Sequence, residues 1–196
     1  MPPLASFRAT IAPFARPLRR IEWWPRTRRR WRYLRDGMAG IAAELHTTSS
    51  GHVSILRQFG ATVGADVDIP GPLLIVNAGD GFSNLTIGSN VHLGAGTLID
   101  LAEAVAIEDY ATISMRSNII THLDVGPGPL KERRPRATGP VRIGRGAYLG
   151  AGATILHGVT VGAEATVGAH ALVDRDVPAG ATVASPRARL VAGQGP

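Results

Sequence analysis

The feature that most constrains this chain is a six-residue period between positions 143 and 178. An aliphatic residue returns at every sixth position, at Ile143, Leu149, Ile155, Val161, Val167 and Val173. Gly follows four of these six residues, which suits turn conformations that a Cβ would resist. A period of six fits neither the turn of an amphipathic helix nor the two-residue alternation of long strands. It is typical of short strands joined by tight turns and stacked into a parallel β-helix around one aliphatic core.

The same period extends upstream but is interrupted there. Aliphatic residues in the repeat phase occur weakly at Val63, Ile69 and Ile75 and firmly at Ile87, Leu93, Ile99, Ile107, Ile113 and Ile119. Ile87 and Ile107 are 20 residues apart, whereas three hexads span 18. We therefore expect two extra residues to bulge out between Asp100 and Ala106.

The period fails a second time after Ile119, at Thr121 and His122. The following residues, 125–140, are rich in Gly, Pro and charge, and we expect them to form a long loop without regular strands. Long loops in compact domains are usually functional or disordered. The repeat resumes at Val141, and the whole pattern predicts about five or six coils.

Charge divides the chain into two parts. Residues 1–35 hold ten Arg and one acidic residue, whereas residues 36–196 hold 11 basic and 14 acidic residues. We assign residues 1–50 to a basic, partly helical segment rich in Arg and Trp, and residues 51–196 to the β-helix domain, with a loop at 123–140. The chain has no Cys, which excludes disulfides and thiolate chemistry.

Two interpretations of the basic segment remain open. Its aromatic residues could cap one open end of the solenoid, or Trp residues interleaved with Arg could contact a membrane surface. Nucleic-acid binding is the least favoured, because nothing further along the chain supports it. No window reaches the roughly 18 apolar residues of a transmembrane helix, and Arg and Pro interrupt the N-terminus where a signal peptide would be apolar. We expect a cytoplasmic protein, with the inner membrane face as its alternative location.

The repeats at 143–178, together with Thr121 and His122 just before an excursion of the chain, resemble the hexapeptide-repeat left-handed β-helix acyltransferases. The similarity is to the sugar O-acetyltransferase-like group, which includes galactoside, maltose and xenobiotic acetyltransferases, and it covers about residues 60 to 190. The resemblance implies an all-β, left-handed parallel β-helix and a homotrimer with active sites between subunits. It also implies acetyl-CoA as co-substrate, a small saccharide acceptor and no metal.

The resemblance also implies roles for individual residues. His122 would be the general base, since imidazole has an unperturbed pKa of about 6.5. Asp100 and Asp124 would bind the acceptor or orient the base. The residues expected to contact coenzyme A are Gly150 and Ala151 at the thioester carbonyl, Ala169 in the pantetheine channel, and Arg175, Arg187 and Arg189 at the phosphates.

Other interpretations of these residues stay open at this point. Asp100 could simply cap a turn, and His157 and His170 are expected to be surface residues within regular hexads. The enzyme could instead acylate an antibiotic or an amino sugar at nitrogen. A third possibility is a β-helix that serves as a scaffold or binding module without catalysis.

Overall fold

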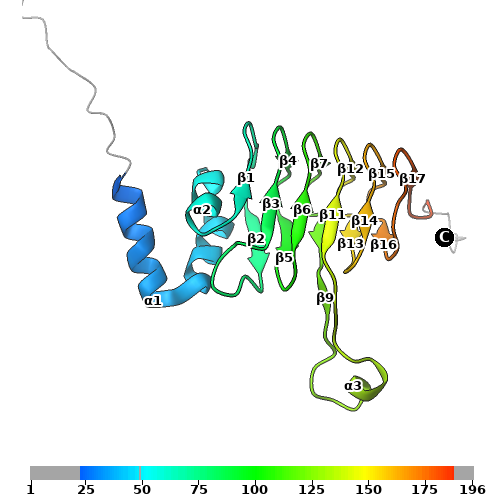
Figure 1. The fold of residues 1–196 in the computed structure, drawn as a ribbon, viewed down its shortest axis with the longest axis horizontal. Coiled ribbons are helices and arrows are strands. Elements are labelled where there is room, and N and C mark those ends of the chain that lie inside the picture. Colours follow the sequence, from blue (N-terminus) through cyan, green and yellow to red (C-terminus); the bar gives the residue numbers. More distant parts are fainter. Residues whose placement is uncertain (1–22, 49, 188–196) are drawn as a thin grey trace, which may run out of the picture.

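The computed structural model describes residues 23–48 and 50–187, in which parallel strands wind into a β-solenoid with helices at its N-terminal end (Figure 1). Sheet 1 consists of β1 (Thr62–Val63), β3 (Leu85–Ile87), β6 (Val105–Ile107), β11 (Val141–Ile143) and β14 (Thr160–Val161). Sheet 2 consists of β4 (His92–Leu93), β7 (Thr112–Ile113), β12 (Tyr148–Leu149), β15 (Thr166–Val167) and β17 (Thr182–Val183). Sheet 3 consists of β2 (Leu73–Val76), β5 (Thr97–Asp100), β8 (Asn118–Ile119), β13 (Thr154–Ile155) and β16 (Leu172–Val173). This architecture confirms the predicted hexapeptide-repeat parallel β-helix.

The aliphatic residue of each hexad points into the core. The six residues at 143, 149, 155, 161, 167 and 173 are all buried. Ile143 pairs with Val161, 18 residues on, so one coil is three hexads. The glycine after the aliphatic residue was expected to allow a turn conformation, but the structure gives a different reason for it. A Cβ on Gly144 would lie 2.6 Å from the backbone nitrogen of Ala163, so this position is restricted by the close approach of the next coil.

All extra residues of the irregular coils are inserted at one corner, between a strand of sheet 3 and the next strand of sheet 1. We call residues 77–84, 101–104 and 120–140 the insertion corner. The length of each insertion follows from the sequence separation between aliphatic residues that pair in neighbouring coils, which is 18 in a regular coil. They are Ile75 with Ile99, 24 residues apart, Ile99 with Ile119, 20 apart, and Ile119 with Ile155, 36 apart. The predicted two-residue insertion after Asp100 is therefore confirmed.

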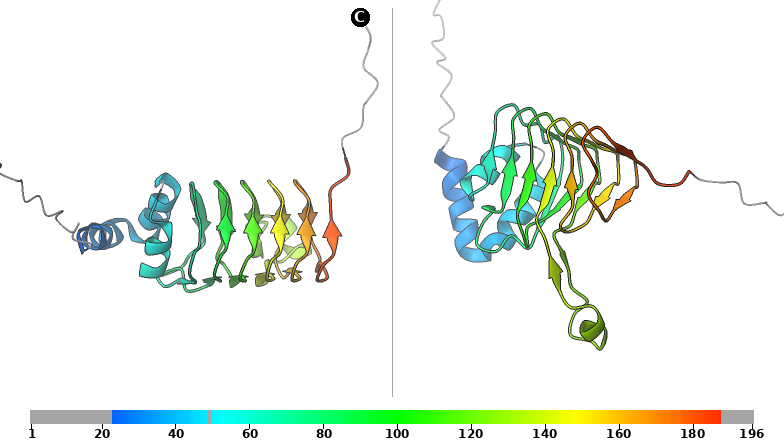
Figure 2. Two further views of the ribbon diagram at one scale, coloured as in Figure 1. Left: turned by 90° about the horizontal axis from the view of Figure 1, so that it is seen from above. Right: turned by 45° about the vertical axis from the view of Figure 1, so that its right-hand side comes forward.

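The longest insertion projects from the body as an arm (Figure 1 and the right-hand view of Figure 2). Its two sides, β9 (His122–Leu123) and β10 (Ala137–Thr138), pair antiparallel, and α3 (Leu130–Arg133) lies between them. The expectation of a loop without regular strands was wrong, because the two ends of the segment pair with each other even though its Gly- and Pro-rich middle cannot join the coils.

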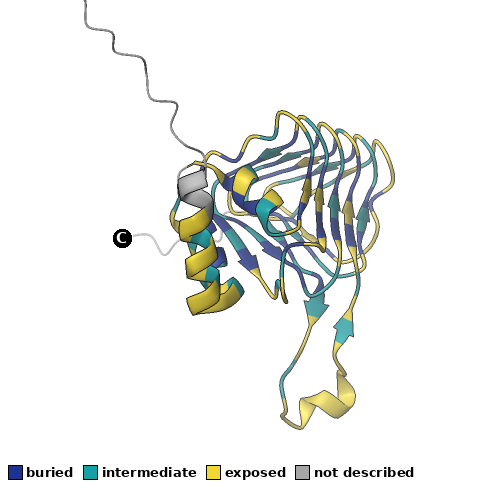
Figure 3. Ribbon diagram, turned by 60° about the vertical axis from the view of Figure 1, so that its left-hand side comes forward, coloured by how far each residue is buried: buried dark blue, intermediate teal, exposed yellow. Residues whose placement is uncertain are grey.

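Helices cover the N-terminal end of the stack. α1 (Trp23–Thr47) is kinked at Gly37, whose φ is 61°, and α2 (His52–Gln58) follows it. Ile41 and Leu45 in α1 and Ile55 in α2 are fully buried. Figure 3 shows buried segments in the helices at this end of the stack, next to the coils. The part of α1 after Gly37 thus packs on the first coil. None of the described helices has the length and apolar character needed to cross a membrane.

Candidate active site

The insertion corner gathers polar side chains from three successive coils. Asp100 ends β5, His122 begins β9 directly after Thr121, and Asn77 follows β2. The coils stack in register, so residues that leave sheet 3 at the same corner lie above one another. The short insertion after Asp100 and the six extra residues after β2 give the backbone room to turn these side chains toward a single carboxylate.

The Asp100 carboxylate is the centre of the cluster, and its side chain is 1% exposed. Its Oδ1 accepts hydrogen bonds from Asn77 Nδ2 at 2.7 Å and from the backbone N–H of Ala102 at 3.2 Å. Its Oδ2 accepts from the N–H and the hydroxyl of Thr121, both at 2.9 Å, and from His122 Nδ1 at 2.5 Å. A buried carboxylate with this many donors satisfies its hydrogen-bonding capacity without water.

These hydrogen bonds keep Asp100 charged. Burial by itself raises the pKa of the carboxyl, because it disfavours the charged form. The donors outweigh burial, with Asn77 and then His122 as the largest contributions, and hold the pKa of Asp100 well below its usual range. The site therefore contains a fixed negative charge beside the imidazole.

The Asp100 carboxylate fixes the tautomer of His122. A charged carboxylate can only accept hydrogen bonds, so Nδ1 of His122 carries the proton and donates it. Nε2 is then left with a lone pair, and 28% of the side chain is exposed. An imidazole held in this way can accept a proton from a substrate at Nε2, which is the geometry that a general base requires.

Where the arm leaves the coils, its two strands are hydrogen-bonded to the same cluster. Thr121 accepts a hydrogen bond from the N–H of Glu103 at 3.1 Å, and its carbonyl accepts one from Gly139 at 2.9 Å. Thr138 on β10 donates to Glu103 Oε1 at 2.9 Å. His122 therefore lies on a two-stranded segment that is fixed on both sides where it leaves the coils.

Of the other residues expected near the base, Asp124 is not brought to His122. Its carboxylate accepts a hydrogen bond from the N–H of Gly126 at 2.8 Å in an exposed turn of the arm. This is a local turn interaction of the kind that Asp commonly makes. Of the two carboxylates expected to orient the base, the structure brings only Asp100 into contact with it.

The residues expected at the thioester lie at a second corner, between sheets 2 and 3. Gly150 and Ala169 stack there, since a Cβ on Gly150 would lie 2.5 Å from the nitrogen of Ala169. The N–H of Gly150 donates to the carbonyl of Val167 at 2.7 Å, whereas the N–H of Ala151 has no partner among the described residues. Within one chain this corner and His122 occupy opposite ends of the sheet 3 strands.

The arginines expected at the phosphates are only partly placed by the structure. Arg175 follows β16 and is exposed, and its guanidinium contacts Asp174 at 3.1 Å. The last coil and residues 183–186 line a cavity of about 390 Å³ beside Arg175. Arg187 is exposed, and Arg189 lies outside the described residues.

Sequence reasoning missed Asn77, although a signal for it exists. Ile75 and Ile99 are 24 residues apart, which equals four hexads, but Gly81 stands where the aliphatic residue between Ile75 and Ile87 is due. Asn77 has a φ of 56°, a conformation that Asn tolerates better than most residues, and this turns its amide toward Asp100. The missing aliphatic residue at Gly81 marks an insertion after Ile75, and this insertion contains Asn77, one coil from Asp100.

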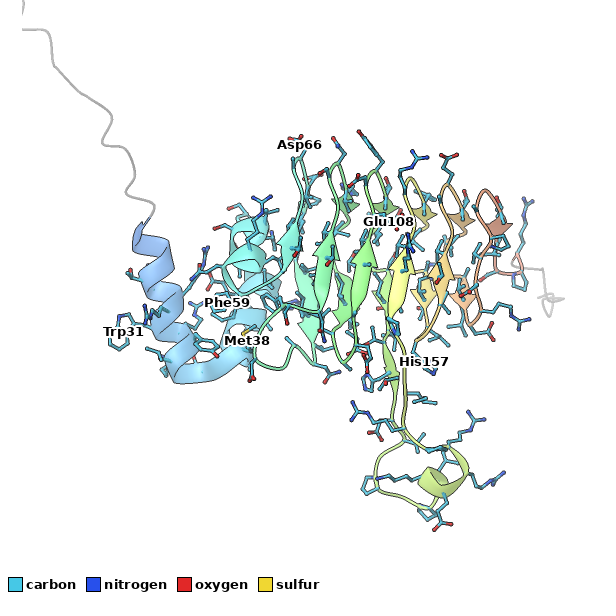
Figure 4. The ribbon with its side chains drawn as sticks, viewed as in Figure 1. Trp31, Met38, Phe59, Asp66, Glu108 and His157 are labelled. Atoms are coloured by element: carbon cyan, nitrogen blue, oxygen red, sulfur yellow. The ribbon has the colours of Figure 1, made fainter. Side chains whose placement is uncertain are left out.

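Two other histidines lie away from the cluster in the regular coils. His157 lies near the base of the arm in Figure 4, one coil beyond His122, and is partly exposed. His170 is exposed and its ring lies against Gly152. Across residues 23–48 and 50–187, no three His, Cys, Asp or Glu side chains gather closely enough to hold a metal ion.

Comparison with known proteins gives the same repeat and the same fold. The family model described as bacterial transferase hexapeptide (six repeats) matches residues 140–175. A hexapeptide-repeat acetyltransferase from Vibrio cholerae superposes with a TM-score of 0.65 at 19% identity, over 81% of this chain and 89% of that chain. No curated protein matches the chain in sequence.

Two further solved structures have been determined with coenzyme A. A galactoside acetyltransferase in complex with coenzyme A has a TM-score of 0.65 and 21% identity, over 80% of this chain and 77% of that chain. A variant of AntD, an N-acyltransferase from Bacillus cereus, in complex with dTDP and coenzyme A has a TM-score of 0.54 and 22% identity, over 69% and 74%. The chain thus carries bacterial transferase hexapeptide repeats and has the fold of hexapeptide-repeat acetyltransferases.

Proposed function

We propose that this protein transfers an acetyl or other short acyl group from acyl-coenzyme A to a hydroxyl of a sugar or saccharide precursor. The observation that carries the proposal is the contact between the buried, charged Asp100 and Nδ1 of His122, which leaves Nε2 free to take a proton. The repeat family and the coenzyme A complexes of proteins with this fold support a thioester donor.

The reaction is a direct transfer without a covalent enzyme intermediate. Nε2 of His122 accepts the proton of the acceptor hydroxyl while its oxygen attacks the thioester carbonyl. The tetrahedral oxyanion then collapses, the carbon–sulfur bond breaks, and the thiol leaves with the proton that His122 returns. Asp100 stabilises the imidazolium that forms between these steps, as a fixed carboxylate does beside a catalytic His.

The N–H of Ala151, which has no partner in the part of the chain that the structure describes, is our candidate for stabilising the oxyanion. A backbone donor aimed at developing negative charge lowers the barrier of acyl transfer. Gly150 and Ala151 were both expected at the thioester carbonyl. Because the N–H of Gly150 already donates to the carbonyl of Val167, we assign the contact with the thioester oxygen to Ala151. Arg175 and Arg187 supply positive charge for the phosphates of coenzyme A.

We further propose a homotrimer in which each active site combines His122 of one subunit with the second corner of its neighbour. Support comes from the placement of His122 and Ala151 at opposite ends of the sheet 3 strands in one chain. A cyclic arrangement repeats one heterologous interface, so every site would be completed in the same way.

Thiol release from acetyl-coenzyme A with a panel of hydroxyl and amino acceptors tests the activity. We expect His122→Ala to lower kcat by about 10²- to 10⁴-fold, the usual contribution of a general base. His92→Ala is the matched control, because His92 also contacts an aspartate through Nδ1, at 2.9 Å, but lies on β4. Full activity of a folded His122→Ala protein would overturn the mechanism, and inactivity of the wild type on every acceptor would favour a scaffold or binding module.

Product analysis separates oxygen from nitrogen transfer. The proposal expects ester products, which hydroxylamine cleaves. Amide products from amino sugars alone would replace it with N-acylation, the reaction named for AntD.

Mixing two inactive variants tests the shared site. Ala169→Glu places a charge in the expected donor channel, at an exposed position where folding should survive. If sites lie between subunits, mixed oligomers of Ala169→Glu and His122→Ala regain activity in roughly a quarter of their sites. If each chain holds a complete site, mixing restores nothing.

A further inference from the structure

The part of α1 before Gly37 presents an exposed face that combines apolar and cationic side chains. We call Arg28, Trp31, Arg32, Leu34 and Arg35 the outer helix face; these residues line one hollow. Trp31 is 73% exposed and Leu34 is 67% exposed. Figure 4 shows Trp31 pointing away from the coils. Large apolar side chains exposed together in this way mark interaction sites more often than isolated ones do.

The opposite side of this helix packs against the rest of the protein, so the outer helix face is directed toward solvent. The ring of Tyr33 lies 5.7 Å from that of Phe59, and Phe59 in turn contacts the buried Phe82. Arg29 donates to Glu44 at 2.9 Å across the kink. The helix is thus anchored to the capped end of the solenoid with Trp31 and Leu34 directed outward.

The charge of this face has one sign. Residues 27–36 contain five Arg and one acid, Asp36, and that acid is paired with Arg35. Within the outer helix face, Arg32 pairs with Glu44 at 2.7 Å and Arg35 pairs with Asp36, whereas Arg28 makes no ion pair with any residue that the structure describes. Residues 1–35 carry a net charge of +9 and residues 36–196 are net acidic, although the arm has a second group of cations at residues 131–136.

We propose that the outer helix face binds an anionic phospholipid surface. A helix with arginines around Trp and Leu buries the apolar residues at the headgroup boundary while the cations contact lipid phosphates. A second copy of this face would place Arg against Arg, because a two-fold interface brings the same patch together. Single-stranded nucleic acid uses aromatic stacking and cations, and it gives no role to the exposed aliphatic Leu34.

The three tryptophans make this proposal directly measurable. They are residues 23, 24 and 31, so intrinsic Trp fluorescence of the full chain reports on this segment alone. We expect a blue shift and co-sedimentation with vesicles containing phosphatidylglycerol, weaker binding in 0.5 M salt, and little binding to pure phosphatidylcholine. Equal binding to both kinds of vesicle, or none, would overturn the proposal.

Variants test which side chains are responsible. Trp31→Gln with Leu34→Gln keeps helix-forming residues and should lower the bound fraction about tenfold or more. Arg28→Gln with Arg35→Gln should lower affinity about fivefold for each arginine. The control is Tyr110→Asn, which removes an aromatic that is 59% exposed on a distant turn.

Circular dichroism and thiol release confirm that each variant is folded. Unchanged vesicle binding by the Trp31 and Leu34 double variant contradicts the assigned face. Tighter binding of single-stranded RNA than of anionic vesicles would overturn the proposal in favour of a nucleic-acid partner.

Discussion

Two His and Asp pairs, one in the insertion corner and one on the regular wall of sheet 2, use the same atoms in different surroundings. Asp100 contacts His122 at 2.5 Å with its side chain 1% exposed, and Asp68 contacts His92 at 2.9 Å with its side chain 66% exposed. Asp100 receives further hydrogen bonds from Asn77, Ala102 and Thr121, all of which need residues that a regular coil does not have. The difference lies in the backbone around the pair, since a perfect hexad has no extra residues with which to surround a carboxylate.

The largest expected effect separates these two carboxylates. Asp100→Asn removes the charge beside His122 and allows the wrong tautomer, so we expect kcat for thiol release to fall about 10²- to 10³-fold. Asp68→Asn should change it less than about twofold, because an exposed pair contributes little. Equal losses of kcat in the two variants would show that the Asp100–His122 pair does not differ in function from the Asp68–His92 pair.

The next effect concerns stability and compares the wall with the arm. A Cβ on Gly144 would meet the backbone of the next coil at 2.6 Å, whereas one on Gly128 in the arm meets nothing within 4 Å. Gly144→Ala should lower the free energy of unfolding by about 1–3 kcal/mol or more, as overpacking does. Gly128→Ala should change it by less than about 0.5 kcal/mol. Urea unfolding followed by circular dichroism measures both.

Asn77→Ala tests the corner itself. The loss of one hydrogen bond to a charged carboxylate should lower stability by about 1–2 kcal/mol and kcat by roughly tenfold. Asn84→Ala is the control, because Asn84 lies in the same insertion but donates to the carbonyl of Leu101. A drop in stability with unchanged kcat in Asn77→Ala would show that Asn77 supports the fold without orienting the base.

The smallest effect is the acid dependence of stability. The folded pKa of Asp100 lies below its unfolded value of about 3.9, so its contribution is complete well above pH 4, begins to decrease near pH 4, and is lost as the pH falls through the folded pKa. Between pH 5 and pH 4 the loss should be a few tenths of a kcal/mol, and Asp100→Asn should remove it. A steeper acid dependence in the variant would contradict the assignment.

The sequence predicted the regular coils better than the insertion corner. The aliphatic residues at 143 to 173 specify coils because each coil repeats the same contacts, and the 20-residue spacing from Ile87 to Ile107 revealed the insertion after Asp100. The break at Thr121 and His122 also marked the histidine that contacts Asp100. Asn77 was missed because the repeat is weak before Ile87, and the pairing of β9 with β10 was missed because tertiary register decides it.

The arm also has a consequence for how the chain folds. Ile119 pairs with Ile155 across 36 residues, twice the 18 of a regular coil such as Ile155 with Val173. Doubling the length of a closed loop adds only about 0.6 kcal/mol of chain entropy. In a stack held together by contacts between neighbouring coils, this addition affects a single step of assembly. The arm can therefore change in length and sequence at little cost to folding, while the strands on either side of it keep their register.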